Sequence, residues 1–271
     1  MKPKFSIILS LTTFVLCCAG CSDSFLEPEN DPILSVPGLE IEDVKKAFSE
    51  LPFKVGVNDF KLDVLYNKKW DFRLIIPAIT DNESAPLFVN LHGGALTPNP
   101  DAHKWTECFV EPALENTKAY VLSPNSQGML WNNPANESQV LNLIAFAIEN
   151  LNIDSDKVVI LGYSDGGTGS WFFADHHPEV FSAAIPMASA YGLSYTDLGL
   201  VKKTDIPLYV IHGSDDVIFP YTNTETWVEQ SVNAGSEIIL VEAVGLTHSV
   251  PCDYLPYLQD AIQWVKTEVW Q

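Results

Sequence analysis

The segment Gly162-Tyr163-Ser164-Asp165-Gly166-Gly167 follows the apolar run Val158-Val159-Ile160-Leu161 and precedes a stretch with helical spacing, Thr168 to Asp175. The apolar run is typical of a strand buried on both faces, so the chain turns here from a strand directly into a helix. Glycines flank Ser164 because a Cβ at those positions would clash where the strand passes into the helix. Glycine and serine also mark ordinary turns, but this placement is that of a G-x-S-x-G nucleophile elbow. It makes Ser164 a candidate nucleophile.

Short apolar runs alternate with amphipathic stretches along the rest of the body. The first two runs read as an antiparallel pair joined through Asn67-Lys68-Lys69, and the later ones suit parallel strands. We therefore expect an α/β fold with a mostly parallel central sheet and helices on both faces. The connection 191–205 is too short for a large lid, which predicts an open site. The expected strands are 60–66, 72–76, 87–91, 119–122, 158–161, 183–186, 208–211 and 238–241, and the expected helices are 138–151, 168–175, 222–233 and 254–270.

The composition limits the classes of protein to consider. The chain has 271 residues, of which 46% are hydrophobic and 18% charged, and this favours one globular domain over a disordered chain. Lys and Arg number 15 against 35 Asp and Glu, which gives a net charge of −20. Such a surface repels a phosphate backbone, so we expect no nucleic acid partner.

Three more motifs stand at the ends of expected strands. A carboxylate in His212-Gly213-Ser214-Asp215-Asp216 is suited to orient an imidazole, and His248 in Gly245-Leu246-Thr247-His248 is suited to act as the general base for Ser164. The order serine, aspartate, histidine along the chain is the order that α/β-hydrolases use. Either Asp215 or Asp216 can be the acid on spacing alone. His92-Gly93-Gly94-Ala95 offers the backbone N–H of Gly94, or of Ala95, to form an oxyanion hole together with that of Asp165.

Through these four motifs, residues 53 to 271 resemble the α/β-hydrolase superfamily. Within it the stretch 152–184 is similar to the exported esterase, phospholipase/carboxylesterase and prolyl-oligopeptidase-like "predicted peptidase" branch. In that branch the acid lies four residues after the histidine of the HG motif, which selects Asp216. The resemblance implies a serine hydrolase with Ser164, Asp216 and His248 as catalytic residues and with little or no lid. It implies no cofactor.

The expected reaction is the hydrolysis of a carboxylic ester, free or linked to a polysaccharide, through an acyl-enzyme. Trp131 and Tyr163 are candidates for an apolar substrate wall, although core packing explains aromatic residues equally well. The histidines outside the motifs have no partners at metal-ligand spacing, so we expect no metal site. A prolyl-oligopeptidase-like peptidase and a non-catalytic binding lipoprotein remain the alternatives.

The first residues read as a targeting signal. Lys2 and Lys4 precede an apolar run from Phe5 to Leu16, and small residues lead to Cys21. This resembles a bacterial lipoprotein signal over 1–20, with Cys21 as the lipidated residue, although Cys18 stands where such signals usually have leucine. A simple secretory signal is the alternative. Both predict export, and the first predicts a lipid anchor at the cell envelope, on the periplasmic side or the outer surface.

The expected organisation is a signal at 1–20, a linker at 21–52 that contains several prolines, and a catalytic domain at 53–271. The body then holds two cysteines, Cys108 and Cys252. Export favours a disulfide between them, and two buried free thiols are the alternative, because spacing does not reveal proximity. The sequence leaves the oligomeric state open.

Overall fold

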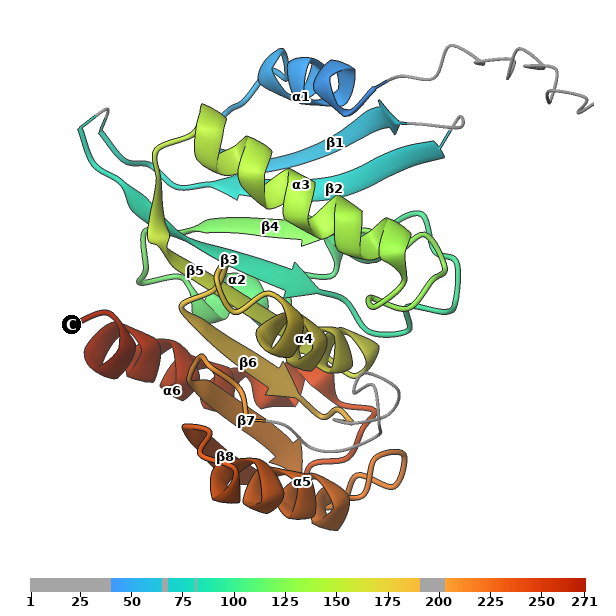
Figure 1. Ribbon diagram of the computed structural model, residues 1–271, viewed down its shortest axis with the longest axis vertical. Helices are drawn as coiled ribbons and strands as arrows, with labels where there is room; N and C mark the ends of the chain where they lie inside the picture. The colour runs from blue at the N-terminus through green and yellow to red at the C-terminus, as the bar shows by residue number, and fades with distance from the viewer. Residues whose placement is uncertain (1–39, 65–67, 81, 191–202) are drawn as a thin grey trace, which may run out of the picture. The chain divides into compact units, whose positions relative to one another are not determined.

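A computed structural model describes residues 40–64, 68–80, 82–190 and 203–271. They form an eight-stranded sheet in the order β1-β2-β4-β3-β5-β6-β7-β8 (Figure 1). The expected signal, the lipidation site at Cys21 and most of the short connection at 191–205 lie outside the described residues. The strands are β1 Gly56–Val64, β2 Lys68–Ile76, β3 Ala85–Leu91, β4 Tyr120–Pro124, β5 Ile153–Tyr163, β6 Ala183–Met187, β7 Leu208–Gly213 and β8 Ile238–Ala243.

The sheet is mixed at one edge and parallel elsewhere, as the apolar runs predict. Strand β1 pairs with β2 antiparallel, and β2 pairs with β4 antiparallel. All pairings from β4 through β8 are parallel. The central strands β4 and β6 are buried at every position, which fits strands that are covered on both faces.

Helices cover both faces of the sheet. In Figure 1, α3, α4 and α5 lie in front of the sheet and α6 lies behind it. Residues of α1, α3, α4 and α5 pack in one hydrophobic cluster, and residues of α2 and α6 pack in the other. The helical elements are α1 Ile41–Ser49, η2 Ala102–Lys104, α2 Val110–Ala113, α3 Pro134–Asn150, α4 Asp165–His176, α5 Tyr221–Asn233, η3 Pro251–Tyr254, α6 Leu255–Trp264 and the π-helical turn η4 Val265–Val269.

Helix α1 corrects the expected domain boundary. The linker was predicted to run to residue 52, but Ile41–Ser49 forms a helix whose Val44 and Phe48 are buried in the core. The Phe48 ring lies 5.9 Å from the ring of Phe72 on β2 and 5.7 Å from that of Phe146 on α3. The folded domain therefore begins before residue 53, because this helix covers one end of the sheet's apolar face.

Residues 93–118 contain two short elements, η2 and α2, that the apolar pattern does not predict. They lie between β3 and β4 and belong to the region around the cavity described below. Among the described residues, none of the helices combines the length and the apolar character that crossing a membrane requires. The fold is that of an α/β-hydrolase, as the strand order, the parallel core of the sheet and the two covering layers of helices show together.

Candidate active site

Ser164 lies on the tight turn between β5 and α4. Its φ of 58° and ψ of −122° fall in a region that residues with a Cβ rarely adopt. The turn is compact because its glycines let the backbone pass closely: a Cβ on Gly166 would lie 1.8 Å from the carbonyl oxygen of Leu91, and one on Gly162 would lie 2.4 Å from the backbone of Gly166. The serine side chain is thereby presented at the carboxyl edge of the sheet, as the elbow motif predicts.

His248 and Asp216 come together with Ser164 at this edge. The Ser164 Oγ lies 2.8 Å from Nε2 of His248, and Nδ1 of the same ring lies 2.7 Å from Oδ2 of Asp216. The three residues come from the β5–α4 turn and from the loops after β8 and β7, so the fold and not sequence proximity assembles them. This is the geometry in which an imidazole accepts the serine proton while a carboxylate fixes its tautomer.

Asp216, and not Asp215, faces the histidine. The Asp216 side chain is buried, and its other oxygen accepts hydrogen bonds of 2.9 Å from the backbone N–H groups of Ile218 and Phe219. Asp215 is exposed and accepts a hydrogen bond from the Ser214 hydroxyl. The family spacing therefore selects the aspartate that the structure places against the imidazole.

His212 is buried beside this site and does not contact Ser164. Its Nε2 donates to the carbonyl oxygen of Phe219 at 2.7 Å, and its Nδ1 accepts from the Thr224 hydroxyl at 3.0 Å. Burial lowers the pKa of His212, so the ring is neutral at neutral pH. It holds the loop that carries Asp216, which is the structural role expected for a histidine that precedes glycine at a strand end.

The loop after β3 also lies next to the nucleophile. A Cβ on Gly93 would lie 3.2 Å from that of Ser164. Of the two candidate donors for the oxyanion hole, the N–H of Ala95 already donates to Oδ2 of Asp165 at 2.9 Å. The N–H of Gly94 donates to no atom of the described residues. Gly94 and the first N–H of α4, that of Asp165, are therefore the available pair.

His92 fixes this loop through hydrogen bonds to the backbone. Its Nε2 accepts from the backbone N–H of Ser126 at 3.0 Å, and its Nδ1 donates to the carbonyl of Gly93. Burial lowers the pKa of His92 to about 4. The Trp131 indole N–H donates to the carbonyl oxygen of His92 at 3.0 Å.

A cavity of about 450 Å³ opens beside Ser164. Tyr163, one of the two predicted wall residues, lines it, and its hydroxyl donates to the carbonyl of His248 at 2.9 Å. Burial raises the pKa of the Tyr163 hydroxyl, so it stays protonated as a donor. Trp131 corrects the other prediction: it is 1% exposed, packs in the core behind His92 and does not line the cavity. The lining residues are Asn90, Leu91, His92, Gly93, Gly94, Lys104, Trp105, Glu107, Cys108, Phe109, Tyr163, Ser164, His248 and Pro251.

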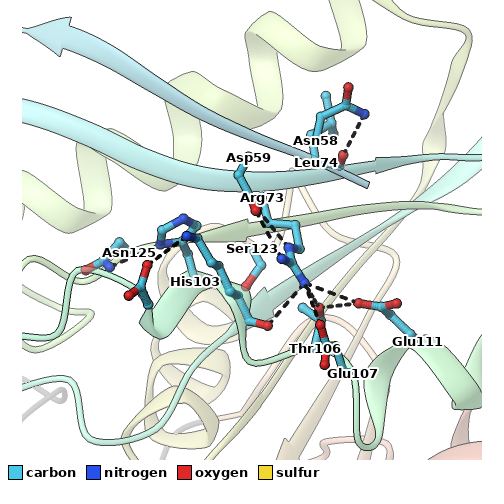
Figure 2. A network of polar contacts seen from close by, with 12 residues as sticks. Asn58, Asp59, Arg73, Leu74, His103, Thr106, Glu107, Glu111, Ser123 and Asn125 are labelled. Carbon is cyan, nitrogen blue, oxygen red and sulfur yellow. Dashed lines mark hydrogen bonds and ion pairs between the residues drawn. The ribbon is translucent and has the colours of Figure 1, made fainter. Parts of the chain in front are cut away.

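The segment 104–109 forms one wall of this cavity and is held by Arg73 on β2 (Figure 2). Arg73 is 6% exposed, and its guanidinium makes a double contact with the Asp59 carboxylate at 2.8 and 3.1 Å. It also donates to the Thr106 hydroxyl at 3.0 Å and to the carbonyl of Lys104 at 3.2 Å. Charge-assisted contacts of this kind fix both position and direction.

A disulfide joins the same wall to the other side of the cavity. Cys108 and Cys252 are bonded, with Cα atoms 5.2 Å apart. Cys252 belongs to η3, next to Pro251 at the cavity edge and four residues after His248. Of the two states that the sequence left open, the structure has the bond.

Sequence reasoning missed Arg73, Asn90 and Phe109. Arg73 could have been noticed, because it is the sole arginine of the chain and interrupts the otherwise apolar run 72–76. Asn90 likewise interrupts the apolar run of β3. Phe109 had none, because its role depends on how the segment between β3 and β4 folds over the sheet. No group of three or more metal-binding side chains lies together in the described part of the chain.

The fold and this site define a serine hydrolase of the α/β-hydrolase class. Comparison with known families agrees: the dienelactone hydrolase family matches residues 124–263, just over half of the chain, and the protein belongs to that family. The match contains Ser164, Asp216 and His248. It begins after the cavity wall at 104–109, so it does not include the residues that define most of the cavity.

Individual relatives are distant. A protein from Salmonella typhimurium, provisionally named a carboxymethylenebutenolidase, is 24% identical over 115 residues, which are 40% of this chain and 42% of that protein. The chain thus matches less than half the length of this relative. A thermostable esterase superposes with a TM-score of 0.62 at 23% identity over 78% of this chain and 62% of its own. A truncated carbohydrate esterase from gut microbiota superposes with 0.63 at 16% identity over 74% and 91%. At such identities the two structures support the fold.

Proposed function

We propose that the protein is an exported carboxylic ester hydrolase that acts through an acyl-enzyme on Ser164. The observation that carries the proposal is the pair of contacts made by His248, 2.8 Å to the Ser164 Oγ and 2.7 Å to the Asp216 carboxylate. A serine is a weak nucleophile until a base accepts its proton, and this histidine is within hydrogen-bond reach.

The reaction has two halves. In the first, Oγ of Ser164 bonds to the ester carbonyl carbon while its proton passes to Nε2 of His248. The tetrahedral intermediate then collapses, the bond to the alcohol oxygen breaks, and the alcohol leaves with that proton. In the second half water attacks the acyl-enzyme, again giving a proton to His248, and the acid leaves as Ser164 regains its proton.

Two groups support the charge changes during this cycle. The backbone N–H groups of Gly94 and Asp165 are suited to bind the oxyanion, and each such donor typically contributes about 3 kcal/mol to the transition state. The buried Asp216 stabilises the imidazolium that forms when His248 is protonated.

For the substrate, acyl groups on a polysaccharide fit an exported enzyme with this site, and the carbohydrate esterase among the structural neighbours is consistent with that choice. The acidic chain, with its net charge of −20, disfavours strongly anionic substrates. The lipoprotein-type signal at 1–20, followed by Cys21 as the lipidated residue, supports a tether to the bacterial cell envelope.

The first experiment is to label the purified protein with a fluorophosphonate probe and to measure hydrolysis of 4-nitrophenyl acetate, in the wild type and in Ser164→Ala. We expect labelling and turnover in the wild type and loss of both in the variant. Full activity of Ser164→Ala would exclude the mechanism. Release of acid from acylated xylan tests the polysaccharide substrate, and turnover of peptide amides without turnover of esters would favour the peptidase alternative.

A further inference from the structure

The cavity beside Ser164 has one polar side chain in its floor whose acceptor is unused. Asn90 of β3 lines the cavity and is 1% exposed. Its Nδ2 donates to the Ser123 hydroxyl at 3.1 Å, but its buried Oδ1 has no hydrogen-bond partner. Buried polar atoms are nearly always paired, so an unpaired amide oxygen in a cavity wall points to a donor supplied by a ligand.

The sheet register sets how far this oxygen lies from the nucleophile. Asn90 pairs with Leu161 on β5, and Ser164 follows three residues later along that strand and its turn. At roughly 3.3 Å per residue, three residues of extended chain span about 10 Å, so the two side chains lie at most about that far apart along the strand direction. An acyl group that bonds to the Ser164 Oγ and donates to Asn90 needs its hydroxyl roughly 6 to 8 Å from the attacked carbonyl carbon, because the bond at one end and the hydrogen bond at the other take up the rest.

The walls between these two ends are aromatic. Phe109 and Tyr163 are buried side chains that line the cavity, and their ring centroids are 6.3 Å apart. Trp105, also in the lining, is 51% exposed. Aromatic walls favour a flat, apolar group, and the volume of about 450 Å³ exceeds what a short acyl group such as acetyl fills.

Asn90 belongs to a row of polar side chains across the sheet, and its hydrogen bond to Ser123 orients its amide. Asp59, Arg73 and Ser123 are opposite one another on β1, β2 and β4, and the Ser123 hydroxyl accepts the hydrogen bond from Asn90. Figure 2 shows that Arg73 in this row also contacts Thr106 of the wall segment. A side chain fixed in this way is preorganised to discriminate between ligands.

We propose that this cavity holds the acyl group of the substrate and that Asn90 selects acyl groups with a hydroxyl roughly 8 Å from the attacked carbonyl carbon, such as a para-hydroxylated 3-arylpropenoyl group. The proposal rests on the ester hydrolase function above and narrows its substrate class. Sites that hydrogen-bond a substrate hydroxyl discriminate against the analogue that lacks it, because the protein group is then left unpaired. The family match starts at residue 124 and so does not include Asn90.

The test compares kcat/KM for methyl 4-hydroxycinnamate, methyl 4-methoxycinnamate and methyl cinnamate. These esters differ only at the ring position that would face Asn90, and the methoxy group accepts but does not donate. We expect the wild type to prefer the hydroxylated ester by about tenfold or more. In Asn90→Leu and Asn90→Ala we expect the three values to agree within about twofold.

Gln139→Leu is the matched control. Gln139 is an equally buried amide with an unpaired Nε2, but it lies on α3 and outside this cavity. It should keep the wild-type preference. Three results would overturn the proposal. The wild type could show no preference for the hydroxylated ester, it could prefer the methoxy ester, or both Asn90 variants could keep the preference for the hydroxylated ester.

Fluorophosphonate labelling and hydrolysis of 4-nitrophenyl acetate separate this result from failure of the proposed function. Labelled, acetate-cleaving protein with no preference among the cinnamates overturns the role of Asn90 alone. Protein that is neither labelled nor active on any ester overturns both.

Discussion

The role of a single residue at this site depends on the backbone around it as much as on its side chain. The positive φ of Ser164, 58°, is maintained by the turn around it, in which the Ser164 N–H donates to the carbonyl of Met187 at 3.0 Å. Glycine and serine at fixed spacing reveal such a turn in a sequence. The choice between Asp215 and Asp216 is not encoded by spacing alone, since it depends on which carboxylate the loop turns inward.

Because Asp216 is turned inward and Asp215 is exposed, substitutions of these two neighbouring aspartates should affect kcat very differently. Asp216→Asn removes the buried charge that holds the His248 tautomer and should lower kcat by about 10³- to 10⁴-fold. Asp215→Asn changes an exposed carboxylate and should leave kcat within about twofold. Steady-state hydrolysis of 4-nitrophenyl acetate measures both. Equal losses in the two variants would contradict the assignment.

The Asp165 side chain predicts a positioning effect. Its carboxylate holds the Ala95 N–H at 2.9 Å and so ties the Gly94 loop to the start of α4. Asp165→Ala keeps the backbone N–H of residue 165 but frees that loop, and kcat should fall about tenfold or more with a smaller change in KM. Asp165→Asn keeps an acceptor oxygen and should restore part of the loss. A change in KM alone would indicate a role in binding instead.

His92 predicts a loss of stability in mild acid. Its pKa in the folded protein is about 4, whereas an unfolded histidine titrates near 6.5. Below about pH 6.5 the unfolded chain therefore binds a proton that the folded protein excludes, so stability falls as the pH drops from about 6.5 to about 4. Between pH 7 and pH 5 this contributes about 2 kcal/mol.

Urea unfolding at these two pH values measures the effect in the wild type and in His92→Gln. The variant removes the titrating ring, so its stability should change less between pH 7 and pH 5. An identical pH dependence in both proteins would show that His92 does not titrate as its burial implies.

At the scale of elements, the region between β3 and β4 is the least predictable part of the chain. It contains η2 and α2, whose short lengths leave no periodic pattern to read. Its position comes from long-range contacts with Arg73 and with Cys252. Helix α3, in contrast, starts four residues before its predicted start, although the sequence contains a helix-start pattern there. Pro134 is the first residue of the helix, and the Asn133 side chain caps it by accepting from the Ala135 N–H.

The disulfide predicts a coupled loss of stability and binding. Cys108 and Cys252 are 144 residues apart in the sequence, so the bond restricts the unfolded chain strongly. Replacing both with serine should lower the free energy of unfolding by about 2–5 kcal/mol. Because both cysteines adjoin the cavity, KM for a cinnamate ester should rise more than KM for 4-nitrophenyl acetate. Denaturant unfolding and steady-state kinetics check the two effects, and a rise in KM that is equal for both esters would contradict the second.

For the whole molecule, the sequence predicts all eight strands and the antiparallel start, because buried parallel strands leave continuous apolar runs. Of the covering helices it predicts α3, α4, α5 and α6. It also brings out Ser164, His248 and the pair Asp215 and Asp216, because each stands in a motif at a strand end, and the family resemblance then selects Asp216. It does not predict the wall at 104–109 or the buried helix α1. Both depend on contacts between segments that are distant along the chain, which neither periodicity nor spacing records.

Helix α1 predicts that the folded domain needs residues before 53. Phe48→Ala removes a fully buried ring from the contacts with Phe72 and Phe146 and should cost about 3–5 kcal/mol of stability. Val57→Ala, at a 51% exposed position on β1, should stay within about 0.5 kcal/mol. Thermal or denaturant unfolding checks both. If the Phe48 variant were as stable as the Val57 variant, residues 41–49 would be a linker, as the sequence predicted, and not part of the folded core.

The bond between Cys108 and Cys252 also makes the cavity depend on its chemical surroundings. It covalently joins the wall segment, which Arg73 also holds, to the short helical turn that follows His248, and this covalent link exists only when the thiols are oxidised. Thiols stay reduced in a compartment rich in glutathione or thioredoxin, and they pair in an oxidising one. The same chain would therefore have a looser cavity while it is kept reduced, and its ability to discriminate between acyl groups would be acquired on oxidation.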